Sequence, residues 1–166
     1  MSEPFENSHL QQAVSRLQTG GVIAYPTEGV WGLGCLWTDE VAIKEILRLK
    51  QRPLEKGMIV LCAQLSDIEA FLLPLSTEHQ QQIAQQYPHP VTWILPCKSS
   101  VSESVRGQHN SIAVRFSRHP QVQELCAAVG PIISTSANPT GLAAAMSAED
   151  VRQYFNDQLS YILPGE

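Results

Sequence analysis

Short apolar segments alternate with helix-forming segments along the whole chain, and this alternation constrains the fold more than any other feature. Segments typical of buried strands lie at residues 22–25, 58–62, 91–95, 111–116, 132–133 and 159–163. Helix-forming segments separate most of them, which favours the α/β class. Some connections are short enough for antiparallel neighbours, so we expect a mixed parallel and antiparallel sheet with flanking helices.

Four helix starts carry capping or first-turn signals. They are Ser8 with Gln11, Asp39 with Glu40, Pro120 at a first helical position, and Ser147 with Asp150. Gly20 and Gly130 are placed to end the first and third of these helices, and Lys50 ends the second just before a proline. A fifth capping signal, Ser66 with Glu69, precedes a further polar helix that is predicted near residues 78–86.

Length and composition fit a single domain over residues 1–166. The hydrophobic fraction of 43% excludes a disordered chain, and the net charge of −5 argues against nucleic-acid binding through bulk charge. The charge is unevenly distributed, however. Residues 44–118 hold 9 of the 11 basic residues and 6 of the 16 acidic ones, a net +3 that allows a local basic surface.

We expect a cytoplasmic protein without a membrane span. Residues 125–148 form an uncharged run of 24 residues, long enough to cross a bilayer, but its glycines and prolines would leave backbone groups unsatisfied in lipid. The N-terminus lacks the basic and apolar regions of a signal peptide. The four cysteines form no CxxC pair and the histidines have no metal-ligand spacing, so we expect buried thiols in a reducing compartment and no zinc site.

Three segments that follow predicted strands carry candidate chemistry, because open α/β sheets bind ligands there. The first, residues 25–34, is expected to be a loop and contains Gly32-Leu33-Gly34. The third glycine of a dinucleotide-binding loop is missing, since position 37 is Trp, and no GxxxxGK[ST] motif occurs. Taken alone, these glycines are interpreted as turn residues.

The second segment contains Lys50 and Arg52, which an extended backbone would place on one side to bind a polyphosphate. Residues 44–56 hold five basic residues against two acidic ones. The alternative is a solvated helix C-terminus whose cations favour the helix dipole. The third segment, residues 134–141, has hydroxyls and an amide that could hold phosphate or orient a metal-bound water; the alternative is an ordinary set of turn and cap residues.

Arg115 is a charge within the apolar segment 111–116, so it needs an internal partner or a ligand carboxylate. An ion pair with a residue such as Glu28 is the alternative to a ligand. No G-x-S-x-G surrounds Ser136, so an activated serine nucleophile is not expected.

The order of these motifs resembles the YrdC family. It runs Y-P-T-E at 25–28 with G-L-G at 32–34, L-K-x-R-P at 49–53, P-V-T at 90–92, A-V-R at 113–115 with H-P at 119–120, and S-T-S-A-N at 134–138. The similarity extends from about residue 10 to residue 166, and the combination of K-x-R with S-x-N is specific to that family.

The resemblance implies a twisted mixed sheet with a concave basic face and the activity of a threonylcarbamoyl-AMP synthase, a nucleotidyltransferase. Such an enzyme joins L-threonine, bicarbonate and ATP into threonylcarbamoyl-AMP and pyrophosphate. A tRNA threonylcarbamoyl-transferase complex then transfers the threonylcarbamoyl group to the adenosine beside the anticodon.

The resemblance also implies two groups of site residues. Those for ATP and its Mg²⁺ are Lys50, Arg52, Lys56, Ser111, Ser136 and Asn138. Those for L-threonine are Thr27, Gly29, Arg115 and Ser134. Lys50, Arg52, Ser136 and Asn138 form the catalytic set; Ser136 and Asn138 would orient the Mg²⁺ that accompanies ATP, and no metal site of the protein's own is implied.

Three departures from the family pattern concern the threonine contacts and not the reaction class. Lys56 stands where many relatives have Asn, Gly29 replaces a frequent Thr, and Leu61 stands where some have His. Short bacterial relatives generally continue for about twenty residues beyond Glu166, so the resemblance implies a shortened C-terminus. The rival interpretation is a module that binds double-stranded RNA or tRNA and assists ribosomal RNA maturation, although RNA-binding aromatic patterns are absent.

Overall fold

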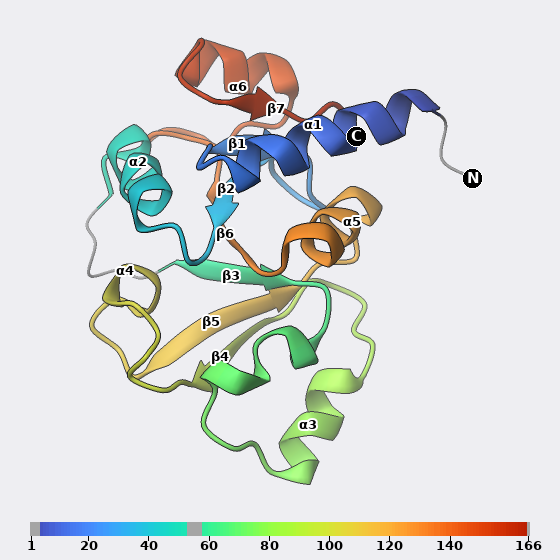
Figure 1. Ribbon diagram of the computed structural model, residues 1–166, viewed down its shortest axis with the longest axis vertical. Helices are drawn as coiled ribbons and strands as arrows, with labels where there is room; N and C mark the ends of the chain where they lie inside the picture. Colours follow the sequence, from blue (N-terminus) through green and yellow to red (C-terminus); the bar gives the residue numbers. More distant parts are fainter. Residues whose placement is uncertain (1–3, 53–57, 166) are drawn as a thin grey trace.

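The computed structural model describes residues 4–52 and 58–165. In this part of the chain seven strands form one sheet, in the order β4-β5-β3-β6-β2-β1-β7 (Figure 1). The strands are β1 (Ile23–Tyr25), β2 (Gly32–Leu36), β3 (Ile59–Cys62), β4 (Thr92–Pro96), β5 (Ser111–Phe116), β6 (Ile132–Ser136) and β7 (Tyr161–Ile162). The α-helices are α1 (Pro4–Gln18), α2 (Glu40–Lys50), α3 (Thr77–Ala84), α4 (Glu103–Arg106), α5 (Pro120–Val129) and α6 (Ala148–Phe155).

The sheet is mixed, as the short connections predicted. Strand β3 pairs with β5 in parallel and with β6 antiparallel. Strands β4, β2 and β1 extend the sheet on either side by antiparallel pairs, and β7 closes one edge parallel to β1. The predicted α/β class and mixed sheet are confirmed.

Apolar side chains cover both faces of the sheet, since successive strand residues point to opposite sides. On one face, Leu33, Val60, Val114 and Ile133 belong to a core shared with α2, α4 and α6. On the other face, Ile23, Leu61 and Ile132 pack with Leu17 of α1 and Leu125 of α5. Helices α1 and α5 lie beside each other on this second face (Figure 1).

The strand register brings the polar residues of different strands together on the second face. Arg115 lies between Thr92 and Leu61, and Ile59 lies between Ala113 and Ser134. Residues that face each other in register point to the same side of a sheet. The part of this face that α1 and α5 leave open therefore presents side chains from β3, β4, β5 and β6.

The segment expected to be a loop at residues 25–34 ends in a strand instead. Gly32, Leu33 and Gly34 belong to β2 and pair with Tyr25, Ala24 and Ile23. A Cβ on Gly32 would lie 2.9 Å from Cε2 of the Tyr25 ring, and one on Gly34 would lie 2.8 Å from Cε1. The interpretation of these glycines as turn residues was wrong, because they leave room for an aromatic ring that crosses β2.

The helix boundaries follow most of the capping signals. Asp39 accepts a hydrogen bond from the Ala42 N–H at the start of α2, and Ser147 accepts one from the Asp150 N–H at the start of α6. Pro120 begins α5 and Gly130 follows its last residue. The start of α1 was predicted wrongly: the helix begins at Pro4, since proline suits a first turn, and Ser8 lies inside it.

No helix of the described residues is long and apolar enough to cross a membrane. The uncharged run at 125–148 holds the end of α5, all of β6 and the segment leading to α6. All four cysteines are buried and free, as their apolar surroundings predicted.

Candidate active site

A cavity of about 320 Å³ opens on the second face of the sheet. Its polar lining consists of Thr27, Glu28, Arg52, Arg115, Ser117, Ser134, Thr135 and Ser136. A second cavity of about 300 Å³ adjoins it and shares Arg52, Met58 and Ile59 with it. Ser111 and Arg106 line this second cavity. Residues of β3 and β5 line both cavities, and the shared residue Arg52 marks their junction.

The loop between β1 and β2 forms one wall of the first cavity. The Thr27 hydroxyl donates to the Val30 carbonyl at 2.5 Å and accepts from the Gly29 N–H at 3.1 Å. The Glu28 carboxylate accepts from the Ser117 hydroxyl and from the Arg118 and His119 N–H groups. Partial burial opposes the charged form, yet these hydrogen bonds outweigh it and hold the pKa of Glu28 below its ordinary value.

Arg115 enters the cavity from β5. Its Nε and Nη2 donate to the Thr92 hydroxyl at 3.2 Å and 2.8 Å. The ion pair with Glu28 that we held as the alternative is not formed, because the Glu28 carboxylate is engaged by residues 117–119. The guanidinium thus meets a neutral hydroxyl on its own face of the sheet, and it lines a cavity large enough to hold a carboxylate ligand.

Ser134 is held by a buried tyrosine. The Tyr25 hydroxyl donates to Ser134 Oγ at 2.6 Å, from a ring that lies over both glycines of β2. Burial raises the pKa of Tyr25 well above its ordinary value, so the hydroxyl keeps its proton and acts as a donor. Ser134 can then direct its own proton into the cavity.

Lys50 supports the segment after β6 from beneath. It is only 2% exposed, and its Nζ donates to the carbonyls of Ser136 at 2.6 Å and Asn138 at 2.9 Å. The Thr140 N–H in turn donates to the Lys50 carbonyl at 2.8 Å. Burial, with a smaller contribution from the charge of Arg52, lowers the pKa of Lys50 to about 8.

The extended backbone expected at residues 50–52 is not found. Lys50 is the last residue of α2, and Gln51 adopts a left-handed conformation with φ 55° and ψ 46°. The prediction of an extended backbone was wrong, because this left-handed turn follows directly on the helix; Lys50 is buried and Arg52 lines the cavities.

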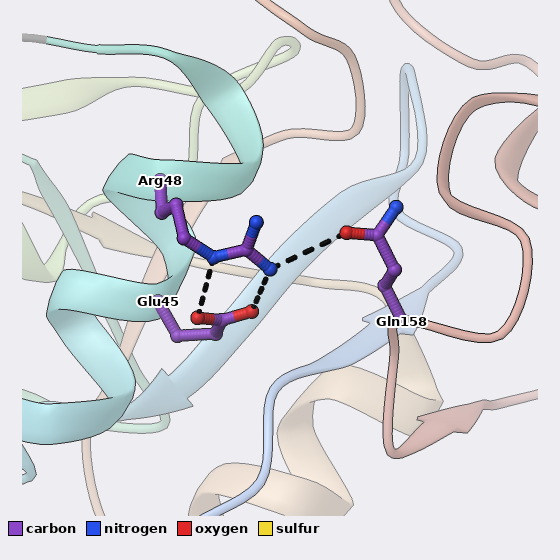
Figure 2. A network of polar contacts seen from close by, with 3 residues as sticks. All are labelled: Glu45, Arg48 and Gln158. Atoms are coloured by element: carbon purple, nitrogen blue, oxygen red, sulfur yellow. Dashed lines mark hydrogen bonds and ion pairs between the residues drawn. The ribbon is translucent and has the colours of Figure 1, made fainter.

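Another basic residue of the same region lies away from the site. Arg48 donates to the Glu45 carboxylate at 2.9 Å and 2.5 Å and to Gln158 at 3.3 Å, as Figure 2 shows. This exposed pair contributes little to stability, but it accounts for one of the five cations that the sequence grouped together.

The structure brings together five of the residues assigned from the sequence. Thr27, Arg52, Arg115, Ser134 and Ser136 line the first cavity. Ser111 lines the second cavity, whereas Lys50, Gly29 and Asn138 line neither of them. Lys56 lies outside the described residues.

Sequence reasoning did not assign Ser117 to the site and did not predict the hydrogen bonds that Glu28 accepts. The available signal was the helix start at Pro120, because the first N–H groups of a helix need an acceptor. That this acceptor comes from a residue 90 positions earlier could not be predicted from local sequence.

A match to a protein-family model identifies the family of this chain. The Sua5/YciO/YrdC model, described as telomere recombination, matches residues 15–166. The chain belongs to the Sua5/YciO/YrdC family. The resemblance argued from the motifs is therefore confirmed, and the strand that carries Gly32 and Gly34 lies inside the matched region.

Two bacterial members of this family are similar over nearly the whole chain. The threonylcarbamoyl-AMP synthase of Saccharophagus degradans is 49% identical over 154 residues, which are 92% of this chain and 81% of that protein. The threonylcarbamoyl-AMP synthase of Marinobacter nauticus is 47% identical over 169 residues, covering 99% of this chain and 89% of its own.

Solved Sua5/YciO/YrdC structures have the same fold. Sua5 of P. abyssi, crystallised with L-threonine, has a TM-score of 0.88 at 29% identity, covering 96% of this chain and 47% of that protein. E. coli YciO has a TM-score of 0.83 at 27% identity, covering 99% of this chain and 81% of its own.

Proposed function

We propose that this chain is a threonylcarbamoyl-AMP synthase, which joins L-threonine, bicarbonate and ATP into threonylcarbamoyl-AMP and pyrophosphate. Relatives of that name share 47–49% of its residues over more than nine-tenths of its length. The geometric observation that supports this function is the position of Arg52. It lines both cavities, at the point where an amino acid in one would meet a nucleotide in the other.

L-threonine is assigned to the first cavity. Arg115 would bind the carboxylate, and Thr27 and Ser134 would contact the remaining polar groups. Gly29 lies in the same loop, and nothing lies within 4 Å of a Cβ added to it. Gly29 would therefore affect threonine binding through the conformation of the loop. The similarity to a Sua5 crystallised with L-threonine supports this assignment.

ATP is assigned to the second cavity and to the junction. Ser111 would lie beside the nucleoside, and Arg52 would contact the phosphates. Lys50 would act through the carbonyls of Ser136 and Asn138, to which it donates. Lys56 is also proposed to contact ATP, an assignment that rests only on the family resemblance.

The reaction needs positioning and charge stabilisation more than a covalent nucleophile. The threonine nitrogen attacks the carbon of bicarbonate, water leaves, and a carbamate remains. A carbamate oxygen then attacks the α-phosphorus of ATP while the bond to the β-phosphate oxygen breaks and pyrophosphate leaves. Because an anion approaches an anion, the enzyme gains most from cations at the junction, and Arg52 lies there.

Mg²⁺ is proposed to enter with ATP. The ion takes oxygen ligands and is usually held by one or two carboxylates together with substrate phosphates. Among the described residues no cluster of three or more His, Cys, Asp or Glu side chains could hold a metal. Ser136 lines the first cavity and could help orient a metal–phosphate complex. The Asn138 Oδ1 is buried without a hydrogen-bond partner and lines neither cavity, so Asn138 belongs to this proposal on the basis of the motif.

The later steps are part of the same proposal. A tRNA threonylcarbamoyl-transferase complex would take threonylcarbamoyl-AMP and modify the adenosine beside the anticodon, in the cytoplasm. We further propose that residues 1–166 act as one domain. The comparisons support the synthase and not the RNA-binding alternative.

Pyrophosphate release from ATP tests the proposed function. We expect release that requires both L-threonine and bicarbonate, with little release when either is omitted. D-threonine at the same concentration is the matched control, because Arg115 and Thr27 would not reach its groups together. Release that is independent of threonine would contradict the proposal.

A further inference from the structure

The Glu28 carboxylate joins two walls of the first cavity. Its Oε1 accepts hydrogen bonds from the Ser117 hydroxyl, the Arg118 N–H (2.9 Å) and the His119 N–H (2.7 Å). These donors lie directly before α5, whose N-cap is His119, and the helix dipole there favours a negative charge. Glu28 itself belongs to the loop between β1 and β2, so its carboxylate fastens that loop to the connection between β5 and α5.

Both fastened segments carry a residue that we assign to L-threonine. Thr27 directly precedes Glu28, and Arg115 lies two residues before Ser117. Both side chains line the cavity. A shift of the loop relative to α5 would therefore change the separation between Thr27 and Arg115.

The far end of the same loop is anchored by different contacts. The Trp31 N–H donates to the Ala145 carbonyl at 2.9 Å, and the Trp31 carbonyl accepts from the Ala137 N–H at 2.8 Å. The indole is buried in the core on the opposite face of the sheet. These contacts hold the loop to residues 137–145, whereas Glu28 holds the part of the loop that faces α5.

We propose that Glu28 is a positioning residue for L-threonine, which keeps Thr27 at a fixed separation from Arg115. This proposal rests on the proposed function, since its ligand is the amino-acid substrate. Glu28 acts on binding and not on the chemical step. Loss of the Glu28 contacts should weaken the binding of threonine more than that of ATP, because Arg52 follows α2, which Glu28 does not contact, and Ser111 lies at the end of β5 away from Ser117.

Steady-state kinetics of pyrophosphate release test the proposal. Glu28→Ala is expected to raise the KM for L-threonine about ten-fold or more, the effect of losing charge-assisted hydrogen bonds. The KM for ATP and kcat should stay within about two-fold of the original values. Glu28→Gln keeps an acceptor oxygen and should recover a large part of the threonine affinity. Glu45→Ala, which removes the carboxylate shown in Figure 2, is the matched control and should leave both KM values and kcat unchanged.

A double variant shows whether Glu28 acts through the start of α5. Ser117→Ala removes one donor of the same contact and should raise the threonine KM in the same direction by a smaller factor. Combined with Glu28→Ala, its effect should be less than additive, as expected for two partners of one interaction. Fully additive effects would show that the two residues act separately and would overturn the proposal.

Amide exchange gives a readout that does not depend on turnover. In Glu28→Ala the Arg118 N–H loses its acceptor and the His119 N–H keeps only its longer hydrogen bond to the Ser117 hydroxyl, at 3.1 Å, so both should exchange faster than in the original protein. Unchanged protection there, an unchanged threonine KM, or equal increases in both KM values would overturn the role of Glu28. If the original protein shows no threonine-dependent release of pyrophosphate, that result counts against the proposed function. The exchange result would still show whether Glu28 holds the N–H groups of Arg118 and His119.

Discussion

Only Gln51 separates Lys50 from Arg52 in the sequence, yet their side chains have different surroundings. The Lys50 ammonium is buried under the segment that follows β6, and its two shorter hydrogen bonds go to backbone carbonyls, with a longer one to the Ser136 hydroxyl at 3.4 Å. Arg52 lies beyond the left-handed turn at Gln51 and lines both cavities. The lysine therefore supports the shape of the site, while the arginine supplies charge inside it.

Replacing each of these cations by methionine separates the two roles. Lys50→Met leaves two carbonyls without their donor and should destabilise the fold by about 2 kcal/mol, lowering Tm by about 5 °C. Arg52→Met should change Tm less but reduce threonine-dependent pyrophosphate release more than about a hundred-fold, as expected when transition-state charge is left unbalanced. Thermal unfolding and the release assay check both. A larger loss of Tm in Arg52→Met than in Lys50→Met would contradict this division.

The sequence indicated which residue types could bind a phosphate or carboxylate, but not which of them would be buried. Lysine is rarely found inside a protein, so nothing in the pattern K-x-R marks Lys50 as the buried member. Its burial depends on the carbonyls of Ser136 and Asn138, more than 80 residues away. The contact of Glu28 with Ser117 has the same origin, since both partners come from loops that only the folded sheet brings together.

At the scale of elements, the glycines of strand β2 are explained by the Tyr25 ring of the neighbouring strand β1. The Tyr25 side chain starts on β1, lies over Gly32 and Gly34 of β2, and reaches Ser134 on β6. A side chain on either glycine would collide with the ring. The pair of glycines thus allows three strands to be connected by one buried hydroxyl.

Gly34→Ala tests this arrangement. The added methyl would lie 2.7 Å from the Ile133 carbonyl oxygen and 2.8 Å from the Tyr25 ring, so we expect a loss of about 2 kcal/mol of stability. Gly29→Ala is the matched control, because nothing lies within 4 Å of its added methyl. Its stability should stay within about 0.5 kcal/mol of the original. Chemical denaturation of both variants measures the difference, and equal stabilities would contradict the role assigned to the ring.

Most elements could be predicted because their signals are local. Strand β5 and helix α5 match their predicted limits, since an apolar run and a first-turn proline followed by a terminal glycine define them within a few residues. Strand β2 could not be predicted in this way. Glycine is unfavourable in strands, and its use in β2 is explained only by the Tyr25 ring that packs across from β1.

At the scale of the whole molecule, the two cores hold all four cysteines away from solvent. Cys35, Cys62 and Cys97 lie in the core shared with α2, α4 and α6, and Cys126 lies in the core beneath α1 and α5. Burial raises the pKa of each thiol above its ordinary value. The nucleophilic thiolate is therefore scarce at each position.

A thiol titration checks the integrity of both cores. In the folded protein at pH 8, Ellman's reagent should react with these four cysteines roughly a hundred-fold more slowly than with the unfolded chain, because reaction needs a local opening. All four should react at once in guanidinium chloride. Rapid reaction of one cysteine in the folded state would show that its core is more open than the structure indicates.

Strand β6 has a consequence for how the chain reaches its final form during synthesis. It lies between β3 and β2, and so connects the half of the sheet made of β4, β5 and β3 with the half made of β2, β1 and β7. The cavity takes Thr27 from one half, Arg115 from the other and Ser134 from β6 itself. Pairings this distant in sequence form late. A ribosome must therefore have released residues 132–136 before a substrate site exists at all, and a nascent chain arrested earlier would hold two incomplete half-sheets with unpaired edges.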